Sequence, residues 1–149
     1  MKIVVHTDVI VDHLQGARSP SVLRKAMGKF FCYTTVFNAI ELFSLARTER
    51  EIDAVEDALA AMKVLGLNAR SAKRYGALVA QGKNTDRWIA LIAGLCLESR
   101  LPVLTDRKKE FSAFRGLVIV PSRMIMSEAS AEETLSSVTT RVPAGRRDI

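Results

Sequence analysis

Cysteine is scarce in this sequence and long hydrophobic runs are absent, which excludes several classes of protein. The two cysteines, Cys32 and Cys96, lie far apart and outside any metal-binding spacing, so we expect buried free thiols in a reducing compartment. No stretch approaches the roughly 18–20 apolar residues that a membrane span needs. The apolar run after Lys2 ends at His6, so no secretory signal peptide is expected. These absences indicate a cytoplasmic protein without a membrane segment.

The common nucleotide-binding and hydrolase motifs are missing as well. The sequence contains no G-x-G-x-x-G, no P-loop, no G-x-S-x-G and no paired-cysteine zinc pattern. It has 149 residues, 48% hydrophobic and 26% charged, which is the balance of one globular domain. Its 22 Lys and Arg against 16 Asp and Glu give a net charge of +6. That excess favours a polyanionic partner.

Short apolar runs alternate with amphipathic segments along the chain. Because strands that alternate with helices and are apolar throughout indicate a parallel sheet covered on both faces, the predicted fold class is α/β. Ser19 followed by Pro20 suggests a helix N-cap and first helical residue. Strands are expected at 2–5, 30–34, 64–67, 102–104 and 117–120, and helices at 9–15, 20–27, 36–47, 49–63, 71–81 and 85–99, with a helical turn at 108–114.

The composition changes after Pro121. Residues 1–121 form the predicted domain, and 122–149 are rich in Ser, Thr, Glu and Ala. Ser130 and Glu133 have the spacing of a capping box and predict one short helix. The segment Val138–Ile149 is expected to be a flexible tail. The chain is therefore expected to be one domain with a C-terminal extension.

Polar residues follow two of the predicted strands. His6 and Asp8 come after the first strand, and Thr105 and Asp106 come after the strand at 102–104. In an open parallel sheet, ligands bind beyond the carboxyl ends of the strands. We therefore expect these four side chains at the binding edge.

Two further acids, Glu41 and Asp86, belong to predicted helices. Glu41 has apolar neighbours, and burying a carboxylate is costly unless a partner compensates it. Asp86 stands in a first helical turn, where it complements the helix dipole. Singly, each acid has a structural explanation, but several acids at one edge repel each other and imply a cation. Oxygen ligands favour Mg²⁺ or Mn²⁺ over zinc.

Four segments resemble, in order, the PIN-domain proteins of the VapC toxin type. They are MKIVVHTDVIVDHLQG at 1–16, TTVFNAIEL at 34–42, DRWIALIA at 86–93 and LPVLTDRKKEFSAFRGL at 101–117. The resemblance covers most of residues 1–120 and implies a three-layer α/β/α sandwich with a parallel sheet. It also implies metal-dependent cleavage of RNA, in which carboxylates hold Mg²⁺ or Mn²⁺ and the metal activates a water. Small domains of this family pair as homodimers, and the toxins bind an antitoxin protein that blocks the site.

The resemblance assigns site residues but departs from the family at both ends of the site. Counting back from Asp12 aligns His6 with the family's first metal-binding aspartate, whereas sliding by two positions puts Asp8 there. Thr105 keeps its spacing to Phe111, which puts Arg107 where Asp or Asn is common. The fourth ligand, Asp106 or none, stays open. The implied metal ligands are His6, Asp8, Glu41, Asp86 and Asp106, and the implied catalytic residues are Glu41, Asp86, Asp8 and Thr105.

Two functions fit this pattern. The leading interpretation is a metal-dependent endoribonuclease of a toxin–antitoxin pair, impaired by His6, because imidazole lacks the negative charge and suits Mn²⁺ better than Mg²⁺. The alternative is a catalytically inactive PIN domain that binds RNA or a protein. His6 fits three histories: a degenerate member of the family, a member adapted to manganese, or a deliberately altered sequence. Four cations beside the site residues could contact RNA phosphates: Arg87, Arg107, Lys108 and Lys109.

Overall fold

The computed structural model describes residues 1–82 and 86–139. Its sheet has 5 strands in the order β3-β2-β1-β4-β5, and all of them are parallel, as the apolar runs predicted. The strands are β1 (Lys2–Val5), β2 (Phe31–Thr35), β3 (Lys63–Leu65), β4 (Val103–Leu104) and β5 (Ile119–Val120). The helices are α1 (Thr7–Gln15), α2 (Val22–Met27), α3 (Val36–Leu45), α4 (Glu49–Ala60), the 3-10 turn η1 (Ala69–Ser71), α5 (Ala72–Gln81), α6 (Arg87–Ser99), α7 (Lys108–Phe111), α8 (Ser122–Met126) and α9 (Ala131–Thr139).

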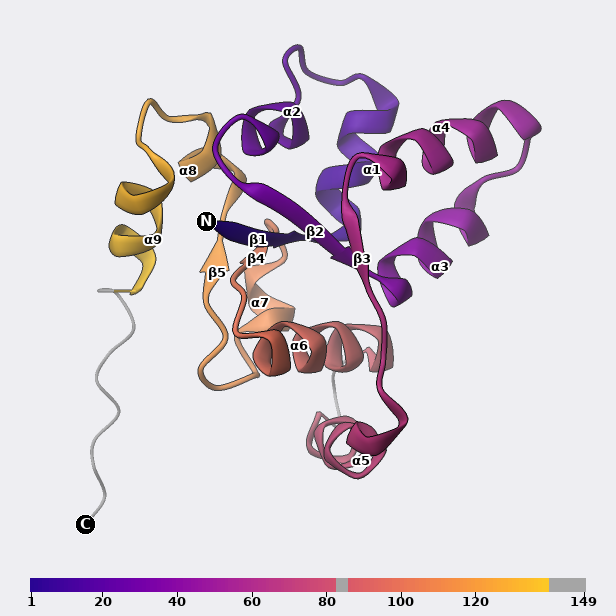
Figure 1. The fold of residues 1–149 in the computed structure, drawn as a ribbon, viewed down its shortest axis with the longest axis vertical. Coiled ribbons are helices and arrows are strands. Elements are labelled where there is room, and N and C mark those ends of the chain that lie inside the picture. The colour runs from indigo at the N-terminus through magenta and orange to yellow at the C-terminus, as the bar shows by residue number, and fades with distance from the viewer. Residues whose placement is uncertain (83–85, 140–149) are drawn as a thin grey trace.

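The strands face two separate hydrophobic cores. Along β1, Ile3 and Val5 belong to one core, and Val4, which lies between them, belongs to the other. This follows from the alternation of side chains across a strand. Helices α1, α2 and α4 lie on one side of the sheet and α5 and α6 on the other (Figure 1). The predicted three-layer α/β/α sandwich is therefore confirmed.

The start of α2 differs from the prediction. The pair Ser19 and Pro20 precedes the helix, which begins at Val22 with Ser21 as its N-cap. The Ser21 hydroxyl accepts a hydrogen bond from the N–H of Arg24 at 3.1 Å. The prediction of Ser19 as the N-cap was therefore wrong by two residues: Ser21 is the residue whose side chain satisfies a free N–H of the first turn.

The C-terminal extension contains more structure than the sequence indicated. Helix α8 was not predicted, and its Ile125 is fully buried in the core beside α2. Helix α9 begins after the predicted cap, since the Ser130 hydroxyl accepts the N–H of Glu133 at 3.2 Å. The helix continues through Val138 to Thr139, so the predicted start of the flexible tail at Val138 is wrong. The rest of the predicted tail, 140–149, lies outside the described residues.

Two further features of the described residues concern apolar helices and cysteines. In the ranges 1–82 and 86–139, no helix combines the length and the apolar character needed to cross a membrane. Cys32 and Cys96 are both free and buried.

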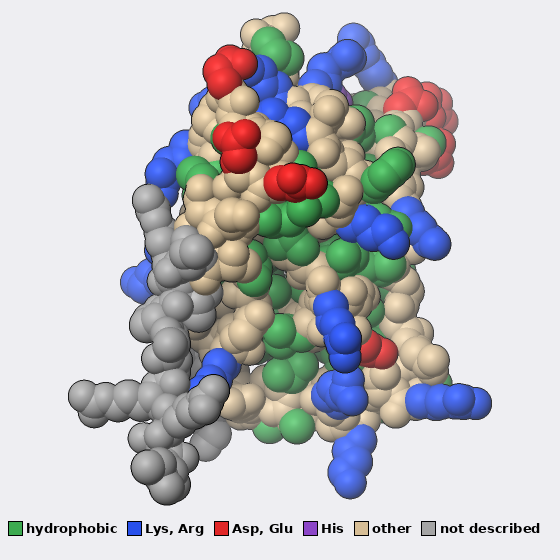
Figure 2. Space-filling model, turned by 60° about the vertical axis from the view of Figure 1, so that its left-hand side comes forward, with side chains coloured by type: hydrophobic (Ala, Val, Ile, Leu, Met, Phe, Trp, Pro, Cys, Tyr) green, Lys and Arg blue, Asp and Glu red, His purple; other side chains and the backbone are tan. Residues whose placement is uncertain are grey.

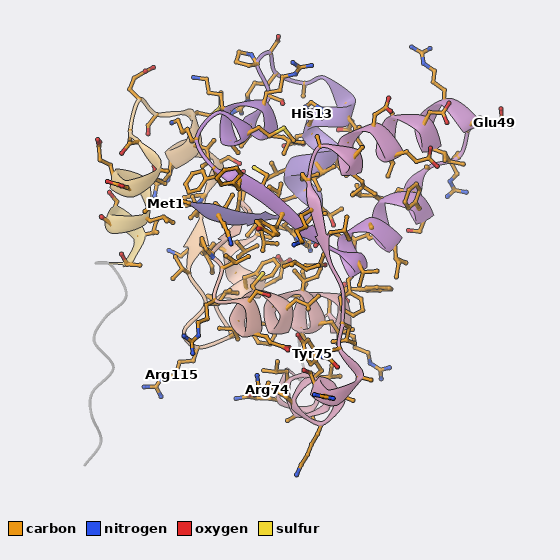
Figure 3. All side chains as sticks on the ribbon, in the orientation of Figure 1. Met1, His13, Glu49, Arg74, Tyr75 and Arg115 are labelled. Carbon is orange, nitrogen blue, oxygen red and sulfur yellow. The ribbon has the colours of Figure 1, made fainter. Side chains whose placement is uncertain are left out.

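Helices α5 and α6 meet at a glycine, which yields a stability prediction. A Cβ atom on Gly94 would lie 2.6 Å from Cε1 of Tyr75. That ring is buried between the helices (Figure 3), and its hydroxyl donates to Glu98 at 2.7 Å. We expect Gly94→Ala to lower the free energy of unfolding by about 1–3 kcal/mol, because the ring cannot move without losing this bond. Urea unfolding measures it.

Gly76→Ala is the matched control. Gly76 is also helical, but a Cβ there would meet no heavy atom within 4 Å. It should leave the free energy of unfolding unchanged or raise it by up to about 1 kcal/mol through helix propensity. Equal stability of the two variants would contradict the close contact at Gly94.

Candidate functional site

The ends of β1 and β4 are tied together by Asp8. These strands are parallel neighbours, with Val5 opposite Leu104, so the residues after them emerge at one edge. The Thr105 hydroxyl lies 3.1 and 3.0 Å from the two carboxylate oxygens of Asp8 and donates to them, and the N–H of Asp106 donates to Oδ2 at 2.9 Å. Burial raises the pKa of Asp8, and these hydrogen bonds oppose the rise. Asp8 therefore serves first as a link between two strand ends.

His6 is the buried centre of this edge. It is the N-cap residue of α1 and only 1% exposed. Its Nδ1 lies 3.0 Å from Nδ2 of Asn38 in α3. The Asn38 side-chain oxygen accepts the N–H of Thr35 at 3.2 Å and the Thr35 hydroxyl at 2.7 Å. Since a backbone N–H can only donate, the amide orientation is fixed, with Nδ2 directed to His6 and to Thr7 at 3.0 Å.

The amide fixes the tautomer of His6. Because Nδ1 accepts from Asn38, the neutral imidazole carries its proton on Nε2. Burial lowers the pKa of His6 to about 4, with the Glu41 charge the largest opposing influence. The ring meets Phe111 edge to face, with centroids 4.9 Å apart. Among the described residues, Nε2 has no hydrogen-bond partner. At neutral pH His6 is thus an uncharged, buried N–H donor.

Glu41 and Asp86 both act on His6 through their charges. Glu41 is half-buried in α3, and Asp86 is the exposed N-cap of α6, where its Oδ1 accepts the N–H of Trp88 at 2.9 Å. Neither hydrogen-bonds to His6 within the described part of the chain. Asp106 likewise holds a helix start, since its Oδ1 accepts the N–H of Ser122 at 2.8 Å. One oxygen of each of these two aspartates is therefore committed to the backbone.

Arg107 brings a positive charge to the same edge. Its Nε and Nη2 donate to the two carboxylate oxygens of Glu110 at 2.8 and 2.7 Å. This paired geometry raises the pKa of Arg107 and lowers that of Glu110. Asp8 and Glu41 also stabilise the guanidinium through their charges. The Arg107 backbone N–H donates to the Thr105 hydroxyl at 3.1 Å.

These contacts do not fit a preformed divalent-metal site. Imidazole binds a metal through a nitrogen lone pair, but Nε2 of His6 carries the proton and the Nδ1 lone pair accepts from Asn38. Asp8 is oriented by hydrogen bonds at both of its oxygens toward the end of β4. Glu41 and one oxygen each of Asp86 and Asp106 remain. Across 1–82 and 86–139, no group of three or more His, Cys, Asp or Glu residues is placed to hold a metal ion. The structure brings the proposed ligands to one edge without arranging them as a coordination shell.

Sequence reasoning missed three residues of this site. Thr35 and Asn38 have capping-box spacing, and the structure has that capping box, but spacing alone does not reveal that Asn38 reaches His6. Arg107 and Glu110 have the i,i+3 spacing of a helical ion pair. The spacing from Arg107 could therefore have identified Glu110 from the sequence.

Comparison with known proteins establishes the fold. No protein-family model and no curated protein sequence matches the chain. Solved structures do match. VapBC2 from Rickettsia felis, bound to a promoter DNA fragment, aligns at 15% identity and a TM-score of 0.69 over 81% of this chain and 98% of the other. The chain has the PIN-like α/β fold. VapBC-1 from nontypeable Haemophilus influenzae aligns at 18% identity and a TM-score of 0.68, over 83% of this chain and 99% of the other. A toxin–antitoxin complex from Klebsiella pneumoniae aligns at 20% identity and a TM-score of 0.61, over 78% of this chain and 95% of the other.

The burial of His6 in this PIN-like fold predicts a pH dependence. The ordinary pKa of 6.5 applies to the unfolded chain, and the folded value is about 4. Between these values the unfolded chain binds a proton that the folded chain does not. This contribution to stability is therefore complete above pH 6.5 and is lost as the pH falls toward 4. We expect a loss of about 3 kcal/mol from His6.

Urea unfolding of the wild type and His6→Asn at several pH values isolates this contribution. The asparagine oxygen can still accept from Asn38 but does not titrate, so contributions from Asp8 and other groups cancel in the difference. The variant His13→Asn removes the other histidine. Its free energy of unfolding should still show the dependence on pH that comes from His6. If the wild type and His6→Asn lost the same stability as the pH falls, the assignment of His6 as a buried neutral imidazole would be wrong.

Proposed function

We propose that this chain is the toxin-type PIN protein of a toxin–antitoxin pair, that it acts on RNA in the cytoplasm, and that its metal-dependent ribonuclease activity is impaired. The PIN-like fold and the four motif segments support the type of protein. The observation that carries the impairment is the arrangement around His6. Glu41 and Asp86 remain as acids, whereas His6 stands where the family resemblance implies a metal-binding aspartate, and Arg107 stands where Asp or Asn is common. Both replacements weaken attraction for a divalent cation.

Surface charge supports RNA as the target. Arg87, Lys108 and Lys109 are exposed beside the candidate site, where they can contact phosphates. The sequence has no acidic residue between Asp57 and Asp86. Lys and Arg side chains predominate over the lower part of the face in Figure 2, and acidic ones gather toward its upper end. That face is the side on which the chain begins, so beside the site itself the positive charge that RNA would meet comes from Arg87, Lys108 and Lys109.

Exposed apolar side chains support protein partners. On α3, Ile40 is 47% and Leu45 is 57% exposed, with Phe43 between them, and Ile52 on α4 is 37% exposed. Such grouped apolar surface is what a partner covers. We propose that an antitoxin and a second copy of the chain use the α3–α4 surface.

A second candidate function is binding without cleavage. Asp8, Asp86 and Asp106 each accept backbone N–H groups that hold strand and helix ends. These acids are therefore useful to the fold in the absence of any metal. Under this second proposal the chain is an inactive PIN domain that binds RNA or a protein partner.

Cleavage of structured RNA in Mg²⁺ or Mn²⁺ tests the first proposal. We expect little metal-stimulated cleavage by the wild type and a gain of at least about tenfold in the double variant His6→Asp/Arg107→Asp, since it restores two carboxylates. Glu41→Gln in that background should abolish the gain. Arg115→Gln is the control, because Arg115 lies on the side of the molecule where the chain begins, away from the site (Figure 3).

RNA binding, measured in parallel by filter retention, separates the two candidate functions. Tight RNA binding without metal-stimulated cleavage in any variant supports the binding module. Absence of both cleavage and RNA binding rejects RNA as the target.

A further inference from the structure

We propose that the guanidinium of Arg107 is the built-in cation of this site and holds the place among its carboxylates that a divalent metal would take. The inference deepens the proposed function, because it rests on the identity of that site. It goes further in stating that the resting protein balances its own acids and takes up no metal.

Arg107 pairs with one carboxylate and places its positive charge near two others. It forms a two-point ion pair with Glu110, and its charge is stabilised by Asp8 and Glu41, which come from α1 and α3. Carboxylates gathered in this way repel each other unless a cation lies among them. Because the guanidinium is planar and always charged, it meets that need without a bound ion.

The backbone around Arg107 holds the cation in place. Its N–H donates to the Thr105 hydroxyl, and the same hydroxyl donates to Asp8. Helix α7 begins at the next residue, Lys108, and the first turn brings Glu110 onto the face of Arg107. The cation is thus anchored through the main chain at the end of β4 and through its side chain on α7.

His6 excludes a metal by an independent route. Its Nε2 carries a proton, and to offer a lone pair there the ring would have to move that proton to Nδ1. Nδ1 would then face the Asn38 amide N–H, which cannot turn away because Thr35 holds the amide oxygen. The nitrogen donor and the cation position are therefore both closed to a divalent ion.

The neighbouring Lys109 provides a matched control. It carries the same charge two residues away and is exposed, yet Arg107–Glu110 is the ion pair found in the described parts of the chain. Replacing either residue by glutamine removes one positive charge. Only the Arg107 change also breaks the ion pair with Glu110 and removes the positive charge that acts on Asp8 and Glu41.

Titration of Mn²⁺ into the full chain without RNA, followed by calorimetry and by the spin-resonance signal of free Mn²⁺, tests the proposal. We expect no saturable binding to the wild type or to Lys109→Gln at millimolar metal. Arg107→Gln should bind at least about tenfold more tightly than either, and His6→Asp/Arg107→Gln more tightly again. Since the Arg107 side chain is 47% exposed, its replacement should leave the fold intact. Mn²⁺ should raise the Tm of the binding variants only.

Two outcomes would overturn the inference. One is saturable Mn²⁺ binding by the wild type with the affinity of Arg107→Gln. The other is an equal gain in Mn²⁺ affinity in Arg107→Gln and Lys109→Gln, which would indicate a general effect of removing one positive charge. Neither measurement involves RNA, so loss of RNA binding would defeat the proposed function and leave the role of Arg107 standing.

Discussion

The backbone N–H of Thr35 can only donate a hydrogen bond, and the chemistry of the site follows from that constraint. It holds the oxygen of Asn38, so the amide nitrogen is directed to His6 and Thr7. A single side chain thereby caps α3, joins β2 to the end of β1 and assigns the proton of the central imidazole. If the amide were free to turn, His6 could offer either nitrogen, and the histidine would no longer exclude a metal.

The acids of the site do structural work that a metal would otherwise compete with. Asp8 accepts the N–H of Asp106 and so links the ends of β1 and β4, Asp86 begins α6, and Asp106 joins the segment after β4 to α8. Each bond satisfies a backbone donor that has no partner in its own helix or strand. The same carboxylates therefore organise the binding edge, whatever ligand the edge receives.

The sequence predicted the sheet because local pattern and burial agree there. The apolar residues Ile3–Val5 leave little choice but a buried parallel strand, and parallel strands bring His6 and Thr105 to one edge. Helix α8 was missed because five residues carry too little periodicity, and Ile125 is buried only through tertiary packing. The Asn38–His6 bond was missed for the same reason: 32 residues separate its partners, and side-chain spacing within α3 does not report which neighbour faces it.

His6 and Arg107 both reduce the negative charge of the binding edge. A carboxylate at the position of His6 would be a buried charge beside Glu41 and Asp86, and it would need a cation to make its burial tolerable. The neutral imidazole removes that need, and Arg107 offsets part of the charge of the acids around it. The edge therefore leaves less negative charge for a divalent ion to neutralise. Under the proposed function, affinity for RNA is then expected from the exposed cations around the edge rather than from a bridging ion.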